Sequence, residues 1–279
     1  IGAYSTANRL ENIEYSDISV VRLVSVNSLV PSSGKHLFAG TSGNDIINAI
    51  NAGSASSIAA TGYDGDDNIT GSAGNDYIFG HAGNDTINGF NANDTLDGGD
   101  GNDTIYGGNG NDTIKTGAGD DKVYGEAGDD IIIQNGSGTQ TYDGGSGTDT
   151  LKVDTSGGWV GTLNKDYPNS IEINMTTGIV GQTNNPNKRD SFSNIENITF
   201  IGSFDTLLTG DGNDNIIIGD TGNDTLDGGN GKDTLDGGAG NDTLKGGTGD
   251  DTYHYTGEDG FDIITDTGGT DTIVFKSGY

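Results

Sequence analysis

The sequence lacks the residues on which several kinds of protein depend. Its 279 residues include no cysteine, one tryptophan, one methionine and three prolines. The absence of cysteine excludes disulfides and thiol catalysis. No apolar run approaches the roughly 20 residues that cross a bilayer as a helix, so no membrane span is expected. Neither an H-E-x-x-H nor a G-x-S-x-G motif occurs, and the three histidines lie far apart in the sequence. We therefore predict that the chain is not an enzyme.

Positive charge is also scarce. The chain has 12 basic and 42 acidic residues, a formal net charge of −30. Such a chain repels phosphate, so nucleic-acid binding is disfavoured. The charge is concentrated: residues 62–130 hold fifteen acidic residues and two lysines. A merely solubilising surface would not follow such boundaries. A composition rich in glycine and in charge of one sign predicts disorder when no counter-ion is present.

Residues 62–133 repeat in nines. Eight consecutive nonapeptides run from GYDGDDNIT to GEAGDDIII, mostly with glycine at places one and four. Each has aspartate at place six and a branched aliphatic residue at place eight, as in Asp67 and Ile69 of the first unit. A fixed period of this kind predicts a solenoid.

The chemistry of one unit follows from its residues. Glycine reaches positive φ at no steric cost, which predicts a six-residue loop with inward-turned carbonyls. The last three residues then form a short strand with one apolar side chain pointing inward. If two units make one coil, loops eighteen residues apart stack about 4.8 Å apart, with Asp67 near Asp85 and Asp85 near Asp103. Carboxylates at that spacing repel by roughly 1 kcal/mol per pair even in water. Calcium, which prefers six to eight oxygen ligands, would reverse the sign of that interaction.

Further units extend the pattern with irregularities. Residues 40–48 form one isolated unit, and the stretch 49–61 indicates a coil with about four extra residues. Gln140 then replaces the aspartate of one unit, where it would offer one oxygen to a weaker site. In the second block, TGDGNDNII is followed by one extra residue and four regular units, with looser units beyond. We predict these metal ligands: Asp45, Asp67, Asp76, Asp85, Asp94, Asp103, Asp112, Asp121, Asp130, Asp149, Asp214, Asp224, Asp233, Asp242 and Asp251.

Units such as GGDGNDTIY and GGAGNDTLK resemble the RTX nonapeptide G-G-x-G-x-D-x-U-x of secreted bacterial toxins, adhesins and exoenzymes. The resemblance implies an all-β fold, a parallel β-roll, with several calcium ions between its loops. It also implies export through a type I secretion channel, with the chain unfolded in the cytosol and folded in calcium outside the cell. The chain would then be a calcium-binding module of a larger secreted or cell-surface protein.

Composition shifts divide the chain into four segments. We expect a flanking β segment over 1–39, with strand character from Ser19 to Val30, a first roll over 40–151 and a non-repeat β insert over 152–204. A second roll spans 205–279 and would end in an aromatic cap made of Tyr253, Tyr255, Phe261 and Phe275. An alternative for 1–39 is a small cap of the solenoid itself.

Two alternatives concern function. The chain could be a ligand-binding solenoid of an adhesin, with a polysaccharide or cell surface as partner, or the RTX tail of an exoenzyme whose catalytic domain lies elsewhere. The insert could bind a ligand through Trp159, Tyr167 and Arg189, although packing of Trp159 over a solenoid end explains it more simply.

Overall fold

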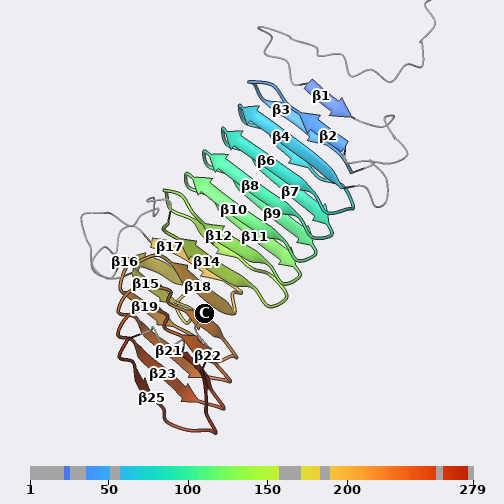
Figure 1. The fold of residues 1–279 in the computed structure, drawn as a ribbon. Coiled ribbons are helices and arrows are strands. Elements are labelled where there is room, and N and C mark those ends of the chain that lie inside the picture. Colours follow the sequence, from blue (N-terminus) through green and yellow to red (C-terminus); the bar gives the residue numbers. More distant parts are fainter. Residues whose placement is uncertain are drawn as a thin grey trace, which may run out of the picture.

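The computed structural model describes residues 22–25, 36–50, 57–156, 171–182, 189–255 and 260–275. Within these ranges the chain forms 26 strands and no helix (Figure 1). Accordingly, no helix in the described ranges could cross a membrane. The strands belong to two long sheets, sheet A with 14 strands and sheet B with 12.

Strands alternate between the two sheets along the repeats. In spatial order, sheet A contains β1 (Arg22–Ser25), β3 (Asp45–Asn48), β5 (Asn68–Thr70), β7 (Thr86–Asn91), β9 (Thr104–Asn109), β11 (Lys122–Ala127), β13 (Thr141–Asp143), β17 (Arg189–Ser193), β16 (Ile179–Gln182), β15 (Ile171–Asn174), β19 (Thr206–Thr209), β21 (Thr225–Asn230), β23 (Thr243–Thr248) and β25 (Ile263–Thr265). Sheet B contains β2 (His36–Ala39), β4 (Ile58–Asp64), β6 (Tyr77–Ala82), β8 (Thr95–Asp100), β10 (Thr113–Ala118), β12 (Ile131–Gln134), β14 (Thr150–Asp154), β18 (Asn197–Ile201), β20 (Ile216–Ile218), β22 (Thr234–Asp236), β24 (Thr252–Tyr255) and β26 (Thr272–Phe275).

The predicted parallel β-roll is confirmed. In the regular part β7 and β9 are neighbours in sheet A and pair in parallel, with Ile87 opposite Ile105, a shift of eighteen residues. Strand β8, which lies between them in the sequence, belongs to sheet B. Two nonapeptides therefore make one coil. The strands are longer than predicted, six residues in β7 to β11, because the extended backbone continues through places one to three of the next unit.

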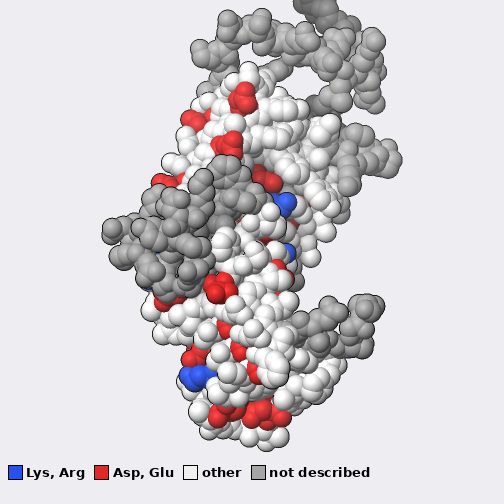
Figure 2. All heavy atoms as spheres, turned by 60° about the vertical axis from the view of Figure 1, so that its left-hand side comes forward, with Lys and Arg blue, Asp and Glu red and all other residues white. Residues whose placement is uncertain are grey.

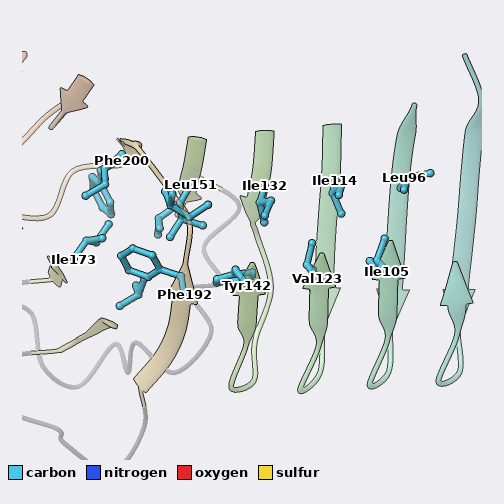
Figure 3. Close-up of a cluster of buried hydrophobic side chains, with 14 of the residues drawn as sticks. Leu96, Ile105, Ile114, Val123, Ile132, Tyr142, Leu151, Ile173, Phe192 and Phe200 are labelled. Carbon is cyan, nitrogen blue, oxygen red and sulfur yellow. The ribbon is translucent and has the colours of Figure 1, made fainter. Parts of the chain in front are cut away.

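The core is a double row of place-eight side chains. Leu96, Ile114 and Ile132 from sheet B face Ile105 and Val123 from sheet A, and all five are fully buried (Figure 3). Burying one such side chain contributes roughly 1.5–3 kcal/mol. Since each nonapeptide buries only one of them, the apolar core is thin for the length of chain it must order.

The roll is interrupted where the insert was expected. Strand β16 runs antiparallel to both β15 and β17, which gives sheet A two additional strands, whereas in sheet B β14 pairs directly with β18. At about 4.8 Å per strand, two additional strands on one side form a wedge. The stack of coils changes direction near the labels β15 to β18 in Figure 1.

The structure describes part of each irregular segment. In the insert, Ile171 and Ile173 are buried, and Arg189 pairs with Glu172 (3.6 Å) across sheet A. Trp159 and Tyr167 lie outside the described residues. In the N-terminal segment, strand β1 lies inside the range where Ser19 to Val30 predicted strand character.

The expected aromatic cap is not formed by its four members. Tyr253 is fully buried, and the rings of Tyr255 and Phe275 meet edge-on with centroids 5.8 Å apart. However, Phe261 is 88% exposed and Phe275 is 73% exposed. Within the described residues, Phe261 and Phe275 therefore leave the apolar side chains of the last coil uncovered.

Place-four glycines allow the coils to stack closely, which yields a first prediction. Gly101 has φ 131°, and a Cβ atom there would collide with the carbonyl oxygen of Gly83 in the preceding coil. Gly101→Ala should destabilise the folded form by about 2 kcal/mol or more, because strain and collision add. Gly212→Ala is the control, since its Cβ would meet nothing within 4 Å. Denaturant unfolding in calcium would compare them, and equal stability would contradict the stacking geometry.

Candidate metal centres

Place-six side chains form two buried ladders, one along each edge of the roll. One carboxylate oxygen of each aspartate accepts the backbone N–H of the place-six residue one coil earlier, as from Asp85 to Asp103 Oδ1 (2.8 Å). On the edge that leads into sheet A, the bonds run from residue to residue through Asp45, Asp67, Asp85, Asp103, Asp121, Gln140 and Asp190, and again through Thr206, Asp224, Asp242 and Asp262. On the other edge they run through Ile58, Asp76, Asp94, Asp112, Asp130, Asp149 and Glu196, and through Asn215, Asp233, Asp251 and Asp271.

The second carboxylate oxygen is buried and has no hydrogen-bond partner in most of these residues. This holds for Oδ2 of Asp67, Asp85, Asp94, Asp103, Asp112, Asp121, Asp130, Asp149, Asp224, Asp233 and Asp251. An unpartnered buried polar atom costs about 1–3 kcal/mol, and more when it is charged. Eleven such atoms in two rows are acceptors suited to a ligand of positive charge.

Backbone carbonyls face the same space. A Cβ atom added to Gly98 would collide with both Asp103 Oδ2 and the carbonyl oxygen of Thr116 in the next coil. The same arrangement recurs at Gly80, which faces Asp85 and Gly98. Carboxylate and carbonyl oxygens converging on a cradle without side chains are the donor set that calcium prefers. The residues therefore fit calcium.

Burial makes ionisation of these aspartates unfavourable when no cation is bound. Desolvation, reinforced by neighbouring ladder carboxylates, raises the pKa of Asp94 to about 9 and that of Asp103 to about 8. The pKa of Asp67 is raised to about 7 by the same two causes. Acidic side chains are also distributed along the face shown in Figure 2, where basic side chains occur at only a few points. A bound dication would offset this repulsion.

The raised pKa values predict how pH acts on the metal-free protein. Between the ordinary pKa of 3.8 and the raised values of about 7–9, the folded form binds protons that the unfolded form has lost. Stability of the metal-free roll should therefore be highest in acid and fall as pH rises through this window. In chelator, the far-UV β signal should be larger at pH 5 than at pH 8. Calcium affinity should change in the opposite direction, since protons and calcium compete. A chelated protein with more β signal at pH 8 would contradict this assignment.

Two predicted ligands have their second oxygen occupied by the protein. Thr41 donates both its backbone N–H and its hydroxyl to Asp45 Oδ2, and Ser72 does the same for Asp76 Oδ2. Both donors stand at place two, where units such as those of Gly99, Gly108 and Gly117 have no side-chain hydroxyl. The sequence did not reveal this difference, because the aspartates themselves are in register.

The placement of Asp214 at place six was wrong. Asp214 is exposed, whereas Asn215 is buried and donates its backbone N–H to Asp233 Oδ1 (2.9 Å). No extra residue intervenes, because Ile217 and Leu226 occupy place eight nine residues apart. The prediction aligned the nearest aspartate, while packing aligns the buried aliphatic residue. Reading the unit from Gly210 and Ile217 would have found the correct register.

Asp214 belongs to a second, exposed ladder at place five. There the backbone N–H of the later residue donates to the earlier side chain, as from Asn102 to Asn84 Oδ1 (2.8 Å) and from Lys232 to Asp214 Oδ1 (2.7 Å). The bonds thus run opposite to those of place six. This explains why either asparagine or aspartate stands at place five throughout the first block, since either supplies the acceptor oxygen.

Gln140 was expected to offer one oxygen to a weaker site, but both ends of its side-chain amide are hydrogen-bonded within the protein. Its Oε1 accepts the backbone N–H of Asp121 (2.7 Å), and its Nε2 donates to the place-four carbonyl of Gly119 (2.7 Å). The side-chain oxygen is thus already used, and an N–H donor points at a carbonyl that a cation would otherwise attract. Asn215 is similar, with its Nδ2 donating to the carbonyl of Glu196 (2.8 Å).

Sequence reasoning missed Asp190 and Glu196. Asp190 accepts the backbone N–H of Gln140 (2.8 Å), and Glu196 accepts that of Asp149 (2.7 Å). They continue the ladders after the insert, at separations of 50 and 47 residues that no nine-residue period contains. The ladder positions of Asp262 and Asp271 could have been found from the looser units.

A different cluster lies at the C-terminal end of the buried ladder that contains Asp233, Asp251 and Asp271. Carboxylate oxygens of Asp251, Asp266 and Asp271 lie within 4.8 Å of one another. Asp266 stands at place one, where most other units have glycine, and it accepts a hydrogen bond from the hydroxyl of Tyr253 (2.5 Å). Three carboxylates around one point give this end more negative charge than a regular ladder position.

The fold and the ladders define a class: a parallel β-solenoid whose turns present buried carboxylates and bare carbonyls to a cation. The comparison with known families is more specific. The model of the RTX calcium-binding nonapeptide repeat matches six overlapping stretches, residues 61–96, 88–123, 106–133, 202–234, 209–244 and 218–253. Residues 61–133 and 202–253, which these stretches cover, are RTX calcium-binding nonapeptide repeats. No curated protein matches the sequence.

The ladder predicts a graded response to losing one aspartate. Asp103 lies between Asp85 and Asp121, and its Oδ2 is unpartnered, so it can serve an ion on either side. Asp45 lies at the start of the ladder, with Oδ2 bonded to Thr41. Asp103→Ala should raise the calcium concentration at the folding midpoint further than Asp45→Ala, since a central loss also uncouples neighbouring coils. Calcium titration by far-UV circular dichroism would compare them, and equal shifts would rule out the eighteen-residue ladder as the binding unit.

Proposed function

We propose that this chain is a calcium-dependent folding module of a larger secreted bacterial protein. The observation that carries the proposal is the double row of buried, unpartnered carboxylate oxygens facing backbone carbonyls. In calcium-poor cytosol the module would stay unfolded, which suits passage through a type I secretion channel. In millimolar calcium outside the cell it would fold and remain stable. This proposal includes no catalytic role for the module.

The two oxygens of a ladder aspartate have different roles, one in the register of the coils and one in calcium binding. One oxygen of each ladder aspartate fixes the stacking of its coil by accepting a backbone N–H. In the eleven aspartates whose second oxygen has no partner, that oxygen is available to calcium, which would supply the positive charge that the ladder lacks. Because the apolar core is thin, folding should depend on this binding energy, as it does in small metal-dependent domains.

Calcium should therefore control folding of the chain. An ion that binds the folded form and not the unfolded one stabilises it in proportion to the logarithm of its concentration. Individual sites should have Kd values on the order of 10⁻⁴–10⁻³ M, as in other extracellular modules. Far-UV circular dichroism should show a coil spectrum in chelator and a β spectrum in millimolar calcium. A β spectrum at pH 8 that chelator leaves unchanged would refute the proposal.

Magnesium should not replace calcium. Loop carbonyls and carboxylates can supply many oxygens at adjustable distances, whereas magnesium requires a tight octahedron and retains its water. At equal millimolar concentrations, magnesium should restore little of the β signal that calcium restores. Equal folding in the two ions would argue against carbonyl-rich sites and for simple charge screening.

A further inference from the structure

Three aromatic side chains form a short row on the outside of the first block. The rings of Tyr63 and His81 are stacked, with centroids 5.6 Å apart and planes 9° from parallel. Phe79 lies against His81, with centroids 6.1 Å apart. Tyr63 is 49% exposed and Phe79 is 39% exposed. The row faces solvent and is no part of the core.

Two of these residues occupy a backbone conformation that suits glycine. Tyr63 has φ 75° and His81 has φ 79°, both at place two, where the next two coils have Gly99 and Gly117. A residue with a Cβ atom in this region costs about 1–2 kcal/mol relative to glycine. Strain of this kind persists where the surroundings impose it and is common at binding sites. The rings are therefore candidates for a function on the surface.

The row ends at a hollow of about 410 Å³. His81 pairs with Gly99 on the next strand, so the position at which a third ring would continue the stack has no side chain. Phe79 and His81 line one part of the hollow, and three carboxylates, those of Asp64, Asp97 and Asp100, line the rest. The hollow is thus lined by aromatic rings and by acidic residues.

The lining selects a flat cation. A guanidinium group is planar, stacks on aromatic faces and donates N–H bonds to carboxylates in a fork, whereas an ammonium group is compact and cannot stack. A neutral ring could stack but would leave the three carboxylates without a counter-charge. Burial raises the pKa of Asp97, although Lys115 on the neighbouring strand and His81 act to lower it, so a further positive charge would favour the ionised carboxylate.

We propose that this hollow binds the guanidinium group of an arginine side chain presented by another protein. The guanidinium plane lies on the ring of His81, above Gly99 of strand β8. Its N–H groups donate to Asp97 and Asp100, which belong to the same strand. The chain's net charge of −30 attracts a basic partner over a longer range. The site lies outside the ladders, so it adds a recognition surface to the folded roll.

The test uses the whole chain in millimolar calcium at pH 7, with N-acetyl-arginine methylamide as the probe. Saturable chemical-shift changes at His81, Phe79 and Gly99 are expected, and they should weaken as salt is added. The lysine analogue tests planarity, and the citrulline analogue, which is planar and uncharged, tests charge. Both should bind more weakly than the arginine probe.

The decisive variant is His81→Gly, which removes the ring and places glycine at a positive φ. It should keep or improve calcium-dependent folding and weaken probe binding about fivefold or more, the factor that corresponds to about 1 kcal/mol. The matched control is Phe90→Gly, at place two with φ 86° on the opposite edge, which should leave binding unchanged. The proposal is overturned if the arginine probe gives no saturable shifts, if the lysine or citrulline analogue binds equally well, or if His81→Gly binds like the unaltered chain.

Discussion

The whole roll depends on the different roles of the two oxygens of each place-six carboxylate. One accepts a backbone N–H from the preceding coil and so fixes the eighteen-residue register. In most of these aspartates, including Asp85, Asp103 and Asp121, the other oxygen is buried and unpartnered beside carbonyls. The same side chain therefore specifies the fold and makes it unfavourable without a cation. Since burial raises the pKa of Asp94 and Asp103 far above the ordinary value, the metal-free roll can relieve this cost only by taking up protons.

Because the apolar core is thin, the stability of the roll depends strongly on the carboxylates. In the regular units of the first block one aliphatic side chain per nonapeptide is buried, while five to eight residues of the same unit are glycine or polar. Ordering the backbone of each residue costs about 1–2 kcal/mol, which a single buried isoleucine cannot offset over nine residues. The hydrogen-bond ladders, the sheet pairing and the cation sites must supply the difference.

The insert shows how the roll tolerates irregularity. Sheet A gains two strands, yet both ladders resume through Asp190 and Glu196, whose carboxylates replace the regular aspartates. Neutral residues at place six gather around the same region, with Gln140, Asn215 and Thr206 each bonded within the protein. Where the coils are unequal, the structure uses side-chain amides and hydroxyls and so depends less on cations. We therefore expect regions of this one solenoid to differ in how far their folding depends on calcium.

The sequence by itself determined the repeating part of the protein. The nine-residue period, with Asp67 and Ile69 recurring from unit to unit, specified two strands per coil, one buried aliphatic residue per unit and stacked acidic loops. It did so because each unit contacts only its neighbours at a constant separation. Tertiary structure alone decided the rest. The antiparallel strand β16, the ladder roles of Asp190 and Glu196 and the register of Asn215 depend on contacts between distant segments, where packing of buried aliphatic residues outweighs the local pattern. The occupation of Asp45 Oδ2 by Thr41, and the hollow beside His81, likewise depend on where side chains point in space, which a linear period does not encode.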